Sequence, residues 1–263
     1  MPLPMPRTAT SRPRTTTIWS ALIRLLLLFL AQPVFAGQFN PVMKIGQQAP
    51  AYQDLPGVDG RKHKLSDWKE TEVLVIVFTC NSCPYAVEYE DRIIEFATRY
   101  IYPGRETPPT VAGAAAAAER PAQDDQVNGE ETAQISGSGN RPGKPVPRVA
   151  VVAINVNKVP EDSFQEMTKR AAAKKLPYPY LYDETQQIAR DYGAVFTPEF
   201  FVLDRERHVV YMGAMDDNSD RTKVTRNYLQ EAVDAVLAGG KPEVTETVAV
   251  GCRVRFERDR RKK

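Results

Sequence analysis

The stretch from Val73 to about Tyr100 constrains the fold most strongly, because a buried strand there leads straight into a helix. Val73–Thr79 is a nearly continuous apolar run rich in β-branched residues, which predicts a strand buried on both faces. After Cys83, apolar residues recur at helical spacing, and Pro84 suits a first helical turn. A second apolar run, Arg148–Val156, predicts another buried strand. The order strand, helix, strand predicts parallel strands with helices packed on the sheet.

The other periodicities extend this α/β pattern. Residues 46–68 alternate in polarity around Asp59-Gly60, a residue pair typical of a β-hairpin turn. Asp183 and Gln186 match a capping box, which predicts a helix ending near Gly193. The remaining predicted elements are a helix over 160–175, strands at Tyr178–Asp183, Phe200–Asp204 and His208–Gly213, and a helix over Tyr228–Leu237.

Residues 1–36 have the pattern of a secretory signal peptide. Arginines precede the apolar run Leu25–Ala31, and Val34 and Ala36 are small residues at the −3 and −1 positions of a cleavage site. The run is short for a membrane span, so we favour a cleaved signal over an uncleaved anchor. We therefore expect a secreted or periplasmic protein, in a compartment where disulfides persist, with membrane contact only if the signal stays uncleaved.

The mature chain is predicted to form one domain, residues 37–252, with an internal interruption. Residues 103–147 are rich in Pro, Gly, Ala, Gln and Glu and have almost no large apolar residue, which predicts a disordered insertion. The tail 253–263 is basic, and we expect it to be a solvated end. The two basic ends leave a net charge of −7 on residues 37–252 out of a total of +2. An acidic body does not favour nucleic-acid binding.

Cys80 and Cys83 lie between the first buried strand and the helix, and this position favours redox chemistry. Free N–H groups and the helix dipole at a helix N-terminus stabilise a thiolate. In such Cys-X-X-Cys settings the thiol pKa falls from about 8.5 toward roughly 3.5–7.5. We expect Cys80 to be the more exposed sulfur and to attack a substrate disulfide, after which Cys83 resolves the mixed disulfide.

Three other uses of the cysteine pair are weaker. A zinc site needs four ligands, and beyond the pair the chain offers one cysteine and two histidines without ligand-like spacing. A c-type haem would need a histidine directly after Cys83, where Pro84 stands. A purely structural disulfide stays possible, although closing so small a loop adds little chain-entropy stabilisation. No metal or bound cofactor is expected.

Thr197-Pro198 stands just before a predicted strand, where proline is tolerated. The bond is a candidate for the cis form, although most X-Pro bonds are trans.

Taken together, these motifs resemble the thioredoxin-like superfamily, and within it a peroxiredoxin-like group related to AhpC/TSA and redoxin proteins but carrying a Cys-X-X-Cys motif. The resemblance lies in "FTCNSCPYAVEYEDR", "TPEFFVLD", "YMGAMDDN" and "GCRVRF", and it covers about residues 45–102 and 148–256. It implies a thioredoxin fold, with a central mixed sheet flanked by helices and an N-terminal β-hairpin extension. It also implies that Cys80 is the nucleophile and Cys83 the resolving thiol. Thr197 would offer its backbone to an extended substrate strand, with Pro198 in cis.

The chain departs from the peroxiredoxin pattern and from the thioredoxin pattern. Cys83 stands where peroxiredoxins carry their peroxide-reducing cysteine, but their preceding Thr or Ser is replaced by Cys80 and their arginine by Pro198. The buried acid of thioredoxin would fall near Leu74, so another proton carrier is needed. Glu90, two helical turns after Cys83, is a candidate, and a solvated carboxylate or a partner of Arg92 is the simpler interpretation.

Cys252 is the third cysteine of the chain. An odd cysteine in a secreted protein suggests a free thiol or an intermolecular bond. It is also a candidate redox thiol, if the tail folds over the site, or an inert buried residue.

The first hypothesis for function is a secreted thiol–disulfide oxidoreductase. It would act on protein thiols or disulfides and receive electrons from a thiol donor, without a cofactor. The alternatives are a thiol peroxidase and a non-catalytic binding module on a thioredoxin scaffold.

Overall fold

The computed structural model describes residues 37–101 and 147–257. The predicted signal peptide, residues 103–146 of the predicted insertion and the last six residues of the tail lie outside the described residues.

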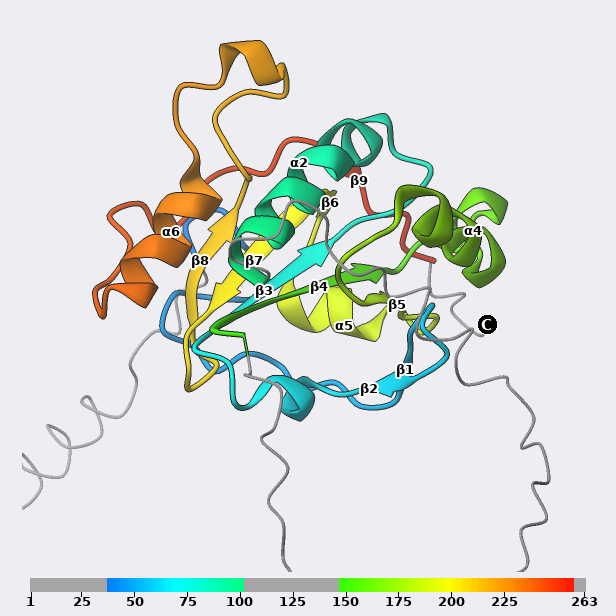
Figure 1. Cartoon of the computed structure of the whole chain (residues 1–263), viewed down its shortest axis with the longest axis horizontal. Helices are drawn as coiled ribbons and strands as arrows, with labels where there is room; N and C mark the ends of the chain where they lie inside the picture. The colour runs from blue at the N-terminus through cyan, green and yellow to red at the C-terminus, as the bar shows by residue number, and fades with distance from the viewer. Residues whose placement is uncertain (1–36, 102–146, 258–263) are drawn as a thin grey trace, which may run out of the picture. The chain divides into compact units, whose positions relative to one another are not determined.

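A five-stranded mixed sheet forms the centre of the fold, in the order β5-β4-β3-β7-β8 (Figure 1). The three strands β3, β4 and β5 run parallel, and β7 and β8 continue the sheet in antiparallel pairing. The strands are β3 (Val73–Phe78), β4 (Val149–Asn155), β5 (Tyr180–Tyr182), β7 (Glu199–Leu203) and β8 (Val209–Gly213). The predicted parallel β-α-β unit is therefore confirmed, and the strands predicted at Phe200–Asp204 and His208–Gly213 are present as β7 and β8.

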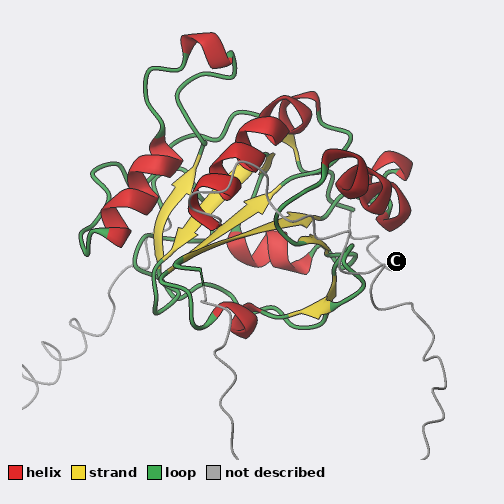
Figure 2. Cartoon of the chain, in the orientation of Figure 1, coloured by secondary structure: helices red, strands yellow, loops and turns green. Residues whose placement is uncertain are grey.

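Helices cover both faces of this sheet, as Figure 2 shows. Val75 on β3 packs in a cluster with residues of α2 (Pro84–Ile101), α4 (Phe164–Lys174) and α6 (Tyr228–Leu237). Its neighbour Ile76 packs in a second cluster with α5 (Gln187–Tyr192) and the N-terminal segment. Adjacent strand residues point to opposite faces. A strand buried on both faces must therefore be apolar at every position, and this is why the continuous apolar runs predicted β3 and β4.

The shorter elements frame the sheet. The predicted N-terminal hairpin is present as β1 (Leu55–Pro56) and β2 (Lys62–His63). Gly60 has a φ of 75° in the turn between them, a value that glycine adopts without strain. The remaining elements are β6 (Phe196–Thr197), β9 (Cys252–Arg253) and the 3-10 helices η1 (Leu65–Trp68), η2 (Pro160–Asp162) and η3 (Arg221–Lys223).

Two sequence-based boundaries are wrong. The capping box of Asp183 and Gln186 does not form, because Gln186 is the residue before α5 and makes no side-chain cap. Asp183 instead accepts hydrogen bonds from Thr185 and from the Ile188 N–H.

The fold also continues past residue 252, where we expected a solvated tail. Arg253 belongs to β9, Val254 is buried, and Phe256 packs against the apolar cluster around α5. Burial of these apolar side chains holds the start of the basic tail on the domain.

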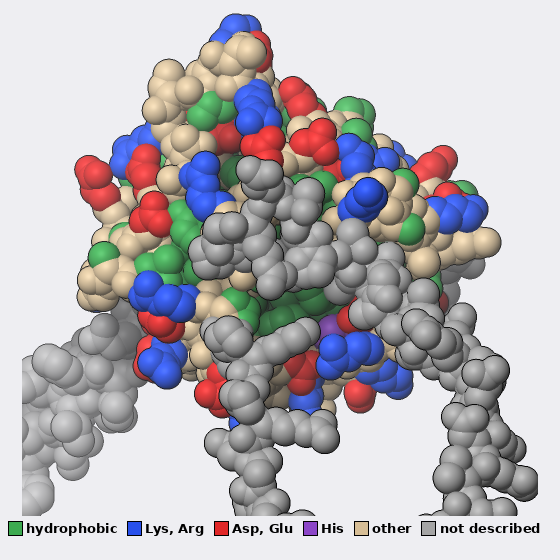
Figure 3. Space-filling model, in the orientation of Figure 1, with side chains coloured by type: hydrophobic (Ala, Val, Ile, Leu, Met, Phe, Trp, Pro, Cys, Tyr) green, Lys and Arg blue, Asp and Glu red, His purple; other side chains and the backbone are tan. Residues whose placement is uncertain are grey.

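The visible surface of the domain carries mixed charge. On the face drawn in Figure 3, basic and acidic side chains are interspersed. No helix among residues 37–101 and 147–257 combines the length and apolar character needed to cross a bilayer.

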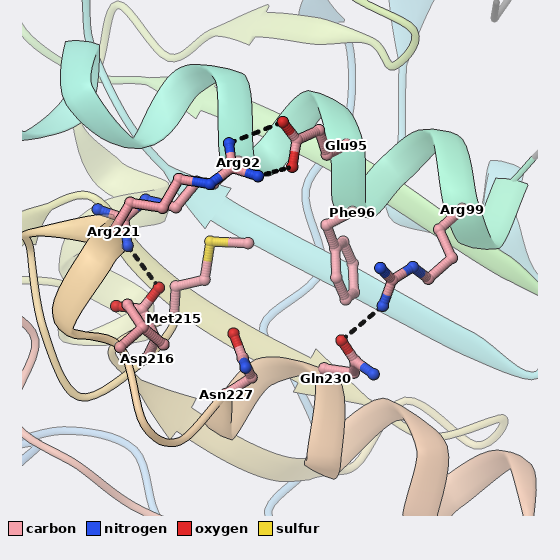
Figure 4. Close-up of a pocket in the computed structure, with 10 residues that line it drawn as sticks. Arg92, Glu95, Phe96, Arg99, Met215, Asp216, Arg221, Asn227 and Gln230 are labelled. Atoms are coloured by element: carbon pink, nitrogen blue, oxygen red, sulfur yellow. Dashed lines mark hydrogen bonds and ion pairs between the residues drawn. The ribbon is translucent and has the colours of Figure 1, made fainter. Parts of the chain in front are cut away.

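A pocket of about 310 Å³ lies between α2 and the segment that leads into α6 (Figure 4). Arg92 donates to Asp216 at 2.7 Å, and both side chains are almost fully buried, at 8% and 2% exposure. Tyr89 also donates to Asp216, and the Arg92 guanidinium lies over the Tyr89 ring. The pair therefore joins the middle of α2 to the end of the β8 segment.

We expect Arg92→Leu to lower the free energy of unfolding by about 3–5 kcal/mol, because it leaves the Asp216 carboxylate buried without its partner. Urea unfolding followed by circular dichroism measures this change. The matched control is Arg221→Ala, which breaks the exposed pair between Arg221 and Glu95 in the same pocket. That control should unfold like the parent protein. An equal loss of unfolding free energy in the two variants would contradict the stabilising role of the buried Arg92–Asp216 pair.

Candidate active site

Both cysteines of the Cys-X-X-Cys motif lie at the carboxyl edge of the sheet. β3 ends at Phe78, and α2 begins at Pro84, so Cys80 sits in the connecting loop and Cys83 directly precedes the helix. Pro84 opens the helix, where its missing N–H is not needed. The Ala86 N–H donates to Cys83 Sγ at 3.4 Å, as a residue at a helix start allows.

The two sulfurs face the Thr197-Pro198 segment, whose peptide bond is cis. Cys83 Sγ lies 3.0 Å from the Thr197 carbonyl oxygen, and Cys80 Sγ lies 3.5 Å from Thr197 Oγ1. Both cysteines are free thiols. The structure therefore brings together the four residues that sequence reasoning placed in the site.

Cys80 is only slightly more exposed than Cys83, and both cysteines are buried. Cys80 and Cys83 retain only 4% and 2% of their accessible surface. Thr197 is also buried, and Cys252 packs against the pair as a partly exposed neighbour. A substrate can reach either sulfur only after this cover moves.

Hydrogen bonds distribute the charge of the thiol cluster unevenly. The hydrogen bond from Cys80 lowers the pKa of Cys83, and the Cys252 thiol and the Ala86 N–H act in the same direction. The same hydrogen bond to Cys83, together with burial, raises the pKa of Cys80. The hydrogen bonds to Cys83 outweigh the effect of its burial, so its pKa is lowered while that of Cys80 is raised. Cys83 is therefore the thiol that ionises first in the reduced site.

Sequence reasoning missed Asp162, which fixes the loop between the two cysteines. Its buried carboxylate accepts hydrogen bonds from the N–H groups of Asn81 and Ser82, at 2.7 and 2.9 Å. It also accepts from Ser82 Oγ at 2.6 Å and from the Asn157 amide at 3.1 Å. These bonds use two loop N–H groups that could otherwise stabilise a Cys80 thiolate. The nearby carboxylate also contributes to the raised pKa of Cys80.

One topological signal could have found Asp162. Residues that follow β3 and β4 lie at the same edge of the sheet, because the two strands are parallel. Asp162 follows β4 as the cysteines follow β3. An acid in that loop was therefore a candidate neighbour of the motif.

Glu90, the sequence-based candidate for a proton carrier, has other partners. Arg170 Nε donates to its carboxylate at 2.5 Å, and Lys174 Nζ lies 3.2 Å from its other oxygen. Both partners lie on α4, so neither is the Arg92 that sequence reasoning considered. No hydrogen bond joins Glu90 to a cysteine among the described residues. Its role as a proton carrier stays a prediction that this geometry does not support.

Comparisons with known proteins find similarity to one family model and to several solved structures. The family model described as AhpC/TSA matches residues 146–212. A hypothetical protein from Sinorhizobium meliloti 1021 is similar at 29% identity and a TM-score of 0.61, over 83% of this chain and 97% of its own. An uncharacterized conserved protein from Geobacillus kaustophilus is similar at 28% identity and a TM-score of 0.61, over 87% of this chain and 98% of its own. The chain is therefore similar to the AhpC/TSA family over residues 146–212, within a thioredoxin-like fold. No curated protein matches it.

The thioredoxin-like domain also buries an acid beside the cis bond. Glu199 directly follows Pro198, and its Oε2 accepts the N–H groups of Val195 and Phe196 at 2.7 and 2.9 Å. Burial raises its pKa to about 7, against the opposing effect of these two hydrogen bonds. Its only sequence signal is that a carboxylate opens an otherwise apolar strand.

Among residues 37–101 and 147–257, no group of three or more His, Cys, Asp or Glu side chains could hold a metal ion.

We expect the thiolate of the reduced protein to belong to Cys83 and to persist below the ordinary thiol pKa of about 8.5. Thiolate absorbance at 240 nm, followed against pH, measures it. Cys83→Ser should abolish the low-pH thiolate. Cys80→Ala should raise the pKa of Cys83, because its first donor is gone. A low-pH thiolate that survives in Cys83→Ser would place the charge on Cys80 and refute the assignment.

We expect Glu199 to make the domain less stable as the pH rises. Its pKa is raised in the folded state, so its stabilising effect is complete below the unfolded value of 4.5 and is lost as the pH passes about 7. The full change is about 3 kcal/mol. Urea unfolding at pH 5 and pH 8 should show this loss in the parent protein and a much smaller one in Glu199→Gln.

The matched control for Glu199 is Glu70→Gln, which changes an exposed carboxylate. It should keep the pH dependence of the parent protein. If Glu199→Gln keeps that dependence as well, Glu199 is ionised in the fold at neutral pH.

Proposed function

We propose that the protein is a secreted thiol–disulfide oxidoreductase that exchanges disulfides with protein thiols through Cys80 and Cys83. One observation carries the proposal: the two free thiols pack together at the start of α2 and both face Thr197. Hydrogen bonding lowers the pKa of one of them, Cys83. A charged sulfur with a second thiol in contact is what disulfide exchange requires. The AhpC/TSA match supports redox chemistry of this general kind.

Proton transfer between Cys80 and Cys83 accompanies the steps of the exchange. Cys80 passes its proton to Cys83 as it attacks the substrate disulfide R–S–S–R′, which forms Cys80–S–S–R and releases R′S⁻. The proton on Cys83 then moves to R′S⁻. Cys83 attacks the Cys80 sulfur, releases RS⁻ and closes the Cys80–Cys83 disulfide. The substrate gains two electrons and one proton, and the protein loses both. A thiol donor of the same compartment restores the dithiol by the reverse exchange.

Secretion follows from the predicted signal peptide of residues 1–36, with cleavage after Ala36. Sequencing the N-terminus of protein recovered from the periplasm or medium tests this step. A mature N-terminus at Gly37 is the expected result.

The reduction potential of the Cys80–Cys83 pair tests the oxidoreductase function. A Cys252→Ser background removes the third thiol, so that one couple is measured. The protein is equilibrated with glutathione or dithiothreitol buffers, and free thiols are trapped and counted by mass spectrometry. We expect one reversible two-electron couple, which Cys80→Ser or Cys83→Ser abolishes.

The value of the potential gives the direction of electron flow. A value near about −270 mV indicates a reductant, and one near about −120 mV an oxidant. A pair that never forms a reversible disulfide would overturn the proposal in favour of a binding module.

A thiol peroxidase is the second candidate, favoured by the charge on Cys83 and by the AhpC/TSA match. The Cys83 thiolate would attack a hydroperoxide to give a sulfenic acid and release the alcohol or water. Cys80 would then condense with it and release water. Cys80 and Pro198 occupy the positions of the peroxiredoxin Thr and Arg, so no dedicated group polarises the peroxide. Hydrogen peroxide consumption with dithiothreitol as the reductant discriminates between the two candidates.

A further inference from the structure

The chain's own C-terminal segment occupies the strand edge beside the thiols. β9 pairs antiparallel with β6, with Thr197 opposite Cys252 and Phe196 opposite Arg253. The Val254 N–H also donates to the Val195 carbonyl at 2.8 Å. This is the edge that the family resemblance assigns to an extended substrate strand. In this structure β9 of the same chain occupies that edge (Figure 1).

The segment is shaped for this place. A Cβ on Gly251 would lie 2.1 Å from the Thr197 carbonyl oxygen, so only glycine permits the approach. Beyond the strand, the Arg255 N–H donates to Asn157 at 3.0 Å and the Glu257 N–H donates to Gln186 at 2.7 Å. These bonds anchor the backbone that follows Cys252.

This anchoring directs Cys252 at the cysteine pair. The three cysteines pack in one cluster, and Cys83 is the neighbour that most raises the pKa of Cys252. A cysteine on a paired strand that packs against the Cys-X-X-Cys motif is placed as a substrate cysteine would be.

We propose that Cys252 is an internal redox partner, which attacks Cys83 Sγ of the Cys80–Cys83 disulfide to give a Cys83–Cys252 disulfide and a free Cys80. The inference rests on the oxidoreductase function proposed above, since that reaction supplies the first disulfide. The step itself is an exchange. One S–S bond forms, one breaks, no electrons are gained or lost, and the proton of Cys252 ends on Cys80.

The charge of the cluster favours this order of events. In the reduced site, the hydrogen bond to the charged Cys83 raises the pKa of Cys252 and holds its proton. Once Cys83 is in a disulfide, that charge is gone and Cys252 can ionise more readily. The product ties β9 covalently to the start of α2. The strand edge of Thr197 is then closed to any external strand until the bond is reduced.

The experiment uses the mature full-length chain and its single-cysteine substitutions. Cys80→Ser keeps only Cys83 and Cys252 of the three cysteines. After equilibration with oxidised glutathione and alkylation, we expect loss of both thiols and an intramolecular Cys83–Cys252 bond by mass spectrometry. Cys83→Ser is the matched control, and its two thiols should form glutathione adducts rather than a bond. Wild-type protein at partial oxidation should contain the Cys83–Cys252 bond with Cys80 free.

A backbone variant tests whether the strand directs the reaction. In a Cys80→Ser background, Gly251→Ala should lower the equilibrium constant for the Cys83–Cys252 bond at least about tenfold. The added Cβ displaces β9, and this lowers the effective concentration of the Cys252 thiol at Cys83. Gly240→Ala is the control, since a Cβ there meets its nearest neighbour at 3.4 Å. It should leave the constant unchanged.

The outcomes separate the two proposals. The proposal for Cys252 would be overturned if Cys80→Ser gave two unlinked thiols or glutathione adducts. It would also be overturned if partially oxidised wild-type protein contained no Cys83–Cys252 bond. The Cys80–Cys83 couple measured in Cys252→Ser would then still stand. An absent couple in Cys252→Ser would overturn the oxidoreductase function instead.

Discussion

The parallel pairing of β3 with β4 is the constraint on which the site depends. The two strands pair from Val73 opposite Val149 to Phe78 opposite Ile154. Each is buried along its whole length. Burial on both faces fixes the strands in place, and parallel direction puts their carboxyl ends at one edge. The cysteine motif and the Asp162 loop meet there because they follow these two strands. A change in register would separate the acid from the thiols.

At that edge, the partners of the two thiols differ, and their pKa values shift in opposite directions. Asp162 accepts the N–H groups of Asn81 and Ser82 and adds negative charge close to Cys80. The Ala86 N–H, in the first turn of α2, remains for Cys83. A thioredoxin-like loop and a helix N-terminus alone would favour either sulfur. The hydrogen bond with Cys83 and burial raise the pKa of Cys80, and Asp162 adds to this effect. The sequence pattern predicted a lowered thiol pKa but not these contacts, so it did not identify which thiol has it.

The sequence predicted the parts of the molecule whose signals are local. β3, α2 and the β7–β8 hairpin follow from continuous or periodic burial, and the motif between β3 and α2 follows from its spacing. β9 was missed because a strand of two residues has no detectable period. The closed position of Cys80 was missed for a related reason. Its cover comes from Thr197 and Cys252, which lie more than 100 residues away in the chain.

β9 links the closed strand edge, the buried thiols and the third cysteine. The segment closes the edge of Thr197 and covers the thiols, and its cysteine packs against the pair that includes Cys83, whose pKa is lowered. A strand that only covered the site would need no sulfur at this position, and a free thiol would need no close approach of Gly251 to Thr197. The two occur in adjacent residues. The end of the chain is therefore better understood as part of the redox site than as a tail, and access to Cys80 and Cys83 depends on whether β9 is paired, released or covalently bound.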